Sequence, residues 1–156
     1  MEMIKITLII LFSLFGLQAN SQIIISNVQD FNFGTFYQGN TGGSVDISIN
    51  GSRSSTGDII LMNTGLAPRQ SVFEIEAPTG TVISILEGQD TILTGSNGGT
   101  VKLQLQATDL ISPFTSTIPP PNRTRLNISA KLIISNRSAS PPGVYTGTFN
   151  ITLHQE

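Results

Sequence analysis

Side chains that could perform acid–base, nucleophilic or metal chemistry are scarce in this chain of 156 residues. The single histidine, His154, lies close to the C-terminus, and there is no cysteine. A Ser/His/Asp hydrolase needs a histidine held against its nucleophile, and a zinc site needs several His or Cys ligands. We therefore expect no enzyme, no catalytic, metal or cofactor-binding residues and no bound cofactor.

Glu74 and Glu76 are the most plausible pair of carboxylates for glycoside hydrolysis. Two residues apart on a strand, they share one face with their backbones about 6.5–7 Å apart, which suits an inverting pair. Phe73 and Ile75 alternate with them and are expected to face the core. The glutamates should then point to water as ordinary surface residues.

Motifs for other ligands are weak. No D-x-D-x-D-G calcium loop is present, and the paired glycines at 42–43 and 98–99 precede no helix, so they indicate turns and not phosphate cradles. Carbohydrate-binding modules use exposed aromatic rings, but the chain has no tryptophan and only two tyrosines. Tyr145 is expected in the core, which leaves Tyr37 as the one candidate for a sugar contact.

Composition narrows the class of protein. Charged residues make up 12% of the chain and the net charge is −2. A nucleic-acid-binding protein needs a basic surface to neutralise phosphates, and coiled coils and helical bundles are rich in charged residues. Neither fits.

Residues 1–21 are predicted to be a secretory signal peptide. Lys5 precedes an apolar run at residues 6–17, which is shorter than the roughly 20 residues of a membrane span. Ala19 and Ser21 are small residues in a cleavage pattern, so cleavage is expected between Ser21 and Gln22. A membrane anchor is the alternative.

The mature chain, residues 22–156, is predicted to be one domain with no membrane span. It is expected in the periplasm, on the outer surface or secreted, and disulfide-free export favours a bacterium.

Apolar and polar residues alternate along the mature chain, which is the pattern of strands with one buried face. No stretch has helical spacing. The sequence predicts an all-β, immunoglobulin-like antiparallel β-sandwich of about 8–9 strands with essentially no helix. The clearest alternating runs are residues 45–50, 101–107, 126–134 and 145–153, and further strands are expected at 22–28, 31–37, 58–63, 71–77, 81–86 and 90–94.

Turns are predicted between these runs from clusters of Gly, Asn, Pro and Ser. They include residues 39–43 and 52–57, and residues 138–143 are expected to form the turn of a final hairpin. Residues 108–125 contain a single proline and a triple proline and are predicted to be a long loop.

Several segments resemble a known family when taken in order. They are PGVYTGTFNITL (142–153), FGTF (33–36), SVDISINGSR (44–53), FEI (73–75) and TVISI (81–85). Together they resemble a family of exported Gram-negative proteins, the domain of unknown function DUF4402, over nearly all of residues 25–154. The closing G-x-Y-x-G-x-F motif is also similar to spore-coat-U-type and fimbrial pilin domains. The resemblance implies an immunoglobulin-like sandwich without known catalytic residues. Residues 126–129 depart from the family, which tends to have a Gly-Gly turn there.

These observations favour an exported, non-catalytic structural or interaction domain, such as a subunit of a cell-surface fibre, coat or matrix. Its partners would be itself or other surface subunits, joined through the free edges of strands. The apolar run at residues 23–25 is expected to form the first strand of the domain; a strand donated to a neighbour is the alternative. A periplasmic or surface carbohydrate-binding module is the alternative function.

One modification site is also predicted. Asp90, Thr91 and Ile92 resemble the D-S/T-apolar pattern at which some Gram-negative bacteria attach O-glycans, so Thr91 is a candidate O-glycosylation site.

Overall fold

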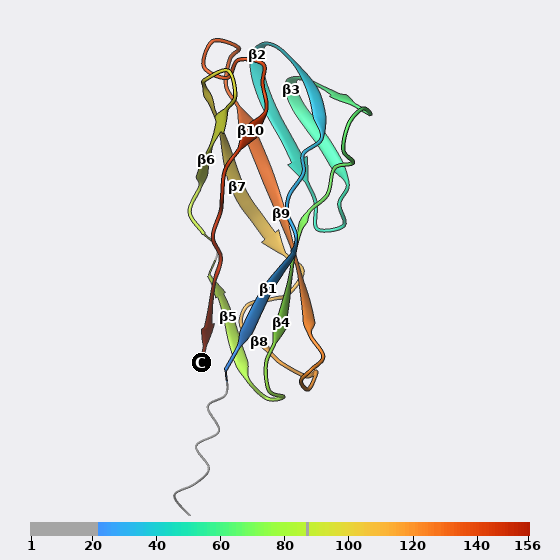
Figure 1. The fold of residues 1–156 in the computed structure, drawn as a ribbon, viewed down its shortest axis with the longest axis vertical. Helices are drawn as coiled ribbons and strands as arrows, with labels where there is room; N and C mark the ends of the chain where they lie inside the picture. The colour runs from blue at the N-terminus through green and yellow to red at the C-terminus, as the bar shows by residue number, and fades with distance from the viewer. Residues whose placement is uncertain (1–21, 87) are drawn as a thin grey trace, which may run out of the picture.

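The computed structural model describes residues 22–86 and 88–156, and throughout these residues the regular structure consists of strands (Figure 1). The all-β class predicted from the sequence is confirmed. No helix in these two ranges is long and apolar enough to cross a membrane. The predicted signal peptide, with Ser21 on one side of its cleavage point, lies outside the described residues.

The strands differ widely in length. They are β1 (Ile24–Gln29), β2 (Thr35–Ile47), β3 (Arg53–Met62), β4 (Ser71–Glu76), β5 (Val82–Leu86), β6 (Thr91–Gly95), β7 (Thr100–Thr108), β8 (Phe114–Thr115), β9 (Thr124–Ile134), β10 (Tyr145–Thr146) and β11 (Thr152–Gln155). This is more than the 8–9 expected, and two of the strands, β8 and β10, have only two residues each.

β9 is the centre of the larger sheet. It pairs with β7 along one side, and along the other with β4 in its first half and β2 in its second half. The sheet continues from β4 to β1 and from β7 through β6 to β10, and every pairing is antiparallel. β11, β5 and β8 form a smaller second sheet. The larger sheet curls, so that the C-terminal segment passes from β10 in one sheet to β11 in the other (Figure 1).

The ribbon formed by β2 and β3 folds back on itself. Residues 43–47 of β2 pair with residues 53–57 of β3, and residues 35–38 pair with residues 59–62, with an irregularity between the two ladders. A charged side chain stabilises this irregularity, because the Asp58 carboxylate accepts hydrogen bonds from the backbone N–H groups of Asn40 (2.7 Å) and Thr41 (3.3 Å).

Glycines allow the close approach at this fold. Gly57 has a φ of +69°, and a Cβ placed on it would lie 2.6 Å from the carbonyl oxygen of Gly42 and 2.8 Å from the Cα of Gly43. A larger residue would collide with backbone that cannot give way.

Two clusters of buried side chains form the core. The first includes Val45, Leu103 and Leu132, and the second includes Ile75, Ile83 and Leu126. Phe31 and Leu105 pack against both clusters and join them into one continuous interior. These side chains come from alternate positions of their strands, so the period-two pattern correctly identified the inward faces.

Four local predictions are wrong. Residues 39–43 are not a turn between two strands, because they lie within β2, at the irregularity in its pairing with β3. Residues 52–57 are not a turn, because β3 begins at Arg53 and the chain reverses at residues 48–52. Residues 145–153 do not form one strand, since β10 ends at Thr146 and β11 begins at Thr152. Residues 138–143 do not close a hairpin, because β10 pairs with β6 and not with β9. The chain runs there from the central strand β9 past β7 and β6 to β10 at the edge of the sheet.

The long loop predicted at residues 108–125 is largely confirmed. It holds the two-residue strand β8, which pairs with Val82 and Ile83 of β5. The first strand also lies within the fold as expected, because β1 pairs with β4 of the same chain.

Candidate functional site

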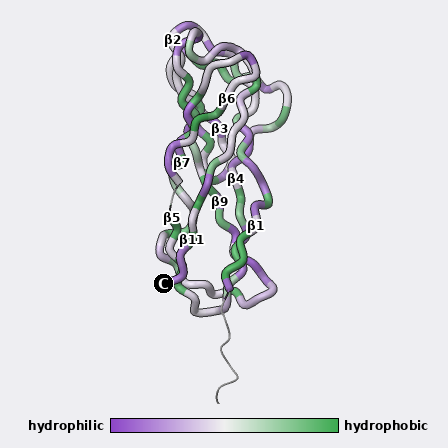
Figure 2. Tube along the Cα trace, turned by 60° about the vertical axis from the view of Figure 1, so that its left-hand side comes forward, coloured by the Kyte–Doolittle hydropathy of each residue, from purple (hydrophilic) through white to green (hydrophobic). Residues whose placement is uncertain are grey.

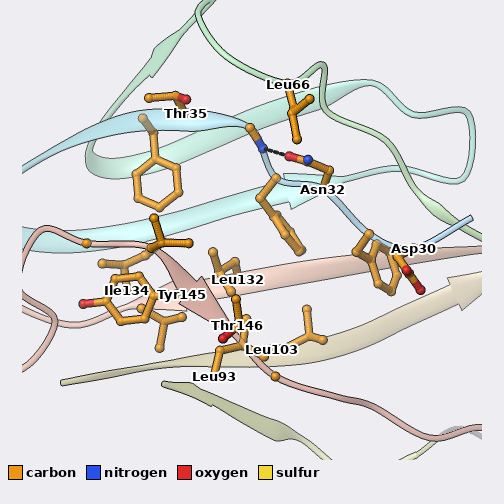
Figure 3. Close-up of a pocket in the computed structure, with 18 of the residues that line it drawn as sticks. Asp30, Asn32, Thr35, Leu66, Leu93, Leu103, Leu132, Ile134, Tyr145 and Thr146 are labelled. Carbon is orange, nitrogen blue, oxygen red and sulfur yellow. Dashed lines mark hydrogen bonds between the residues drawn. The ribbon is translucent and has the colours of Figure 1, made fainter. Parts of the chain in front are cut away.

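The candidate site is an apolar cleft of about 1000 Å³ between residues 31–38, which include the start of β2, and residues 141–149 near the C-terminus. The side chains of Leu93, Leu103, Leu132 and Ile134 form its floor (Figure 3). They come from β6, β7 and β9, three neighbouring strands of the curled sheet. The cleft therefore opens directly onto the first core cluster.

Each wall of the cleft is paired on one side only. Residues 35–38 of β2 pair with β3, and their pairing with β9 starts only at Gly43. Tyr145 and Thr146 of β10 pair with β6. An interior strand has two hydrogen-bonded neighbours, so both walls present a strand edge without a strand partner among the described residues.

Arg53 fixes the first wall. One of its guanidinium nitrogens donates to the carbonyl oxygens of Phe33 (2.9 Å) and Thr35 (3.1 Å), and another donates to that of Met62 (2.9 Å). Gly34, with a φ of +70°, lies directly against this guanidinium, where a Cβ would be in the way. Three charge-assisted hydrogen bonds thus hold the turn into β2 in one geometry.

Aromatic rings close one end of the cleft. The ring centroid of Phe31 is 5.2 Å from that of Phe149 and 5.9 Å from that of Phe33. Phe149 also meets Phe73 edge-on at 6.2 Å. Phe31 and Phe149 come from opposite walls, so this contact joins the walls at the end where Asp30 lies (Figure 3).

Side chains of opposite charge, Asp30 and Arg137, lie at the two ends of the cleft. Asp30 accepts a hydrogen bond from the side-chain amide of Asn27 at 2.6 Å. At the far end, the side chain of Gln38 donates to the carbonyl oxygen of Ser135 at 2.6 Å, which brings the wall beside the loop that carries Arg137. Arg137 is exposed and makes no ion pair within residues 22–86 and 88–156.

Tyr145 is half-buried in the cleft and packs against the first core cluster, as its place on the apolar face predicted. Its hydroxyl donates to the carbonyl oxygen of Pro141. Burial raises the pKa of the Tyr145 phenol, because the charged phenolate loses solvation there.

The side chains considered for catalysis are not gathered at this cleft. Glu74 and Glu76 share one face of β4 as predicted, and both meet Arg123, at 3.7 Å and 3.2 Å. His154 is exposed on β11 opposite Ser84. Among the residues that the structure describes, no three His, Cys, Asp or Glu side chains are grouped so that they could hold a metal ion.

The two remaining candidates lie apart from each other. Thr91 is half-buried at the start of β6, where it pairs with Leu103. Next to it, hydrogen bonding by Gln104, aided by Lys102 at 3.3 Å, lowers the pKa of Asp90. Tyr37 is 51% exposed and belongs to the lining of the cleft. Glycosylation of Thr91 stays a prediction.

The sequence pattern does not predict the cleft. It predicts the floor as core and both walls as ordinary strands. The available signal was the run of aromatic residues Phe31, Phe33 and Phe36 beside the apolar C-terminal motif. Which strands pair with these segments could not be read from that pattern.

Comparison with known proteins gives one match. The model of a family described as a domain of unknown function (DUF4402) matches residues 23–154, which includes both walls and the floor of the cleft. No curated protein and no solved structure matches the chain.

Proposed function

The chain belongs to the DUF4402 family, and we propose that it is an exported, non-catalytic subunit of a cell-surface assembly, such as a fibre, coat or matrix. It would join its neighbours by accepting an extra strand.

The observation that carries this proposal is the cleft with two one-sided walls. Residues 35–38 and residues 145–146 each have one strand neighbour, and an apolar floor lies between them. An extended peptide placed there would pair with free backbone edges and bury alternate side chains on the floor, as in β-strand addition. The cleft has the shape and chemistry of a vacant strand position.

Two features of the sequence support the same proposal: the predicted leader and the closing motif. The predicted leader at residues 1–21 would carry the chain out of the cytoplasm. The closing motif, residues 142–153, is similar to spore-coat-U-type and fimbrial pilin domains, and it supplies one wall of the cleft.

A carbohydrate-binding function has weaker support. Tyr37, at the cleft and 51% exposed, is the observation in its favour. Sugar hydroxyls need hydrogen-bonding partners when they are buried, whereas four aliphatic side chains form the floor of this cleft. An apolar peptide suits that floor better than a sugar.

Immunogold electron microscopy of the native host, combined with sedimentation of the protein released from its surface, tests the proposal. We expect label outside the outer membrane and sedimenting species larger than one chain. Label confined to the cell interior, with a single monomeric species after release, would contradict it.

A further inference from the structure

We infer that Asn50 is a site of spontaneous deamidation in the folded chain, whereas Asn97, in the other asparagine–glycine pair of the sequence, is held unreactive by its contacts. This inference goes beyond the proposed function and does not depend on it.

The two asparagine–glycine pairs have similar backbones. Asn50 and Asn97 are both exposed, and Gly51 and Gly98 have φ values of +82° and +81°. Each glycine N–H donates to the carbonyl oxygen three residues earlier, at 3.0 Å and 3.1 Å. The turn that carries Asn97 joins β6 to β7 at the upper end of the molecule, where Figure 2 shows mostly hydrophilic and intermediate residues in purple and white. Water reaches both pairs, so only their side-chain contacts distinguish them.

Deamidation at such a pair is an intramolecular reaction. The backbone nitrogen of the glycine forms a bond to the side-chain carbon Cγ of the asparagine, and negative charge develops on Oδ1. The bond from Cγ to Nδ2 then breaks, the proton of the glycine N–H ends on Nδ2, and ammonia leaves behind a succinimide ring. Water from the solvent opens the ring to aspartate or isoaspartate, and no atom is oxidised or reduced. The reaction is favoured where donors face Oδ1 and where Nδ2 is free to take up the proton.

The turn at residues 48–52 surrounds Oδ1 of Asn50 with donors. Ser52 donates its backbone N–H at 3.1 Å and its hydroxyl at 2.7 Å, and the hydroxyl of Ser48 donates to the same atom. A backbone N–H can only donate, so the atom that faces it is the oxygen of the amide and not the nitrogen. Nδ2 of Asn50 makes no hydrogen bond within residues 22–86 and 88–156. The contacts therefore stabilise the developing charge and leave the departing nitrogen free.

The contacts of Asn97 are the reverse. Its Nδ2 donates to the carbonyl oxygen of Pro142 at 2.7 Å, and its Oδ1 accepts no hydrogen bond in the described part of the chain. Two further bonds between Ser96 and Val144, at 2.9 Å and 3.1 Å, fix the same contact between the turn and the second wall of the cleft. Loss of ammonia from Asn97 would break the bond to Pro142, so this contact opposes the reaction.

The aspartate products would also differ in their effect on the fold. A carboxylate at position 50 accepts hydrogen bonds from the same three donors, and such charge-assisted bonds are stronger than those to an amide. A carboxylate at position 97 has no proton to donate and would face the carbonyl oxygen of Pro142. The fold therefore tolerates aspartate at the position where the contacts favour its formation.

Mass spectrometry of the mature chain, incubated in mildly alkaline buffer and then digested with trypsin, tests the inference. Trypsin cleaves after lysine and arginine, which places the two sites on separate peptides, residues 22–53 and residues 70–102. Each deamidation adds about 1 Da. In the folded protein we expect Asn50 to react at least about fivefold faster than Asn97, and in urea, where the side-chain contacts are lost, we expect rates within about twofold. A ratio below about twofold in the folded protein would overturn the inference without reference to any variant.

A double variant tests the cause of the reactivity. Ser48→Ala combined with Ser52→Ala keeps Asn50 and Gly51 but removes both hydroxyl donors, so the reaction should slow at least about threefold. Ser54→Ala is the matched control, because Ser54 is exposed on β3 and does not contact Oδ1 of Asn50, and it should react at the wild-type rate. A double variant that reacts as fast as the control would show that these donors do not activate the site.

Urea denaturation of two aspartate variants is an independent measurement. Asn50→Asp should unfold at the same urea concentration as the wild type, whereas Asn97→Asp should unfold at a lower one, because it loses the bond to Pro142. A greater loss of stability in Asn50→Asp than in Asn97→Asp would contradict the contrast between the two sites.

Discussion

At the residue scale, Arg53 has the most demanding structural role near the cleft. Its guanidinium donates to three backbone carbonyls and meets no carboxylate among the described residues. Its removal leaves three carbonyl oxygens at the turn into β2 without that donor, and the first wall loses its attachment to β3.

We predict that Arg53→Ala lowers the free energy of unfolding by about 2–3 kcal/mol, since hydrogen bonds to charged groups contribute roughly 1.5–3 kcal/mol each and Arg53 is only half-buried. Urea denaturation measures the change. Arg125→Ala is the control, with an expected change within about 0.5 kcal/mol. Equal stabilities of the two variants would show that the Arg53 hydrogen bonds do not hold the wall.

The phenol of Tyr145 gives a prediction about pH. Burial raises its pKa above the ordinary value of about 10. The unfolded chain therefore loses this proton at a lower pH than the folded chain does. The contribution of Tyr145 to the free energy of unfolding is complete below a pH of about 10 and is lost as the pH rises through the higher pKa of the folded state.

A Tyr37→Phe variant isolates the signal, because the chain has only two tyrosines. Ultraviolet absorbance should then show one tyrosinate transition above pH of about 10 in the folded protein and a lower one in urea. Coincident transitions in the two states would contradict the burial of Tyr145.

At the scale of elements, the folded-over ribbon of β2 and β3 determines where the cleft lies. It places residues 35–38 away from β9 while residues 43–47 remain paired with it. Gly57 stands at a close approach of this fold, where an added Cβ would lie 2.6 Å from the carbonyl oxygen of Gly42, so the geometry there tolerates no side chain.

Gly57→Ala should lower the free energy of unfolding by more than Gly80→Ala. Both glycines have positive φ, at +69° and +89°, and each substitution incurs about 1–2 kcal/mol for that conformation. Only Gly57 faces backbone atoms within 3 Å of an added Cβ, whereas Gly80 faces open space. Thermal denaturation of the two variants compares them. A smaller loss at Gly57 than at Gly80 would contradict the close packing of the ribbon.

The strands that the sequence predicted best are those with one strictly apolar face. β9, expected at residues 126–134, begins at Thr124 and ends at Ile134, and β7 and β4 lie within two residues of their predicted bounds. The first part of β3 was missed because its residues, 53–57, are polar on both faces and resemble a turn. The cleft could not be predicted, because it depends on which strands pair, and alternation identifies the buried face of a strand but not its neighbour.

At the scale of the whole molecule, the curled sheet leaves an opening between residues 31–38 and residues 141–149. The core continues beneath that opening through Leu103 and Leu132, so the position of one strand is free above an apolar floor. Filling it would cover the cleft and link two chains in one step.

Hydrogen exchange of the assembled protein, compared with the monomer, is the most direct test of this account. We predict that assembly increases the protection of backbone amides in residues 35–38 and 143–149 together, while β9, already paired on both sides, changes little. New protection confined to β3, or none at either wall, would contradict the central claim that the cleft is a vacant strand position.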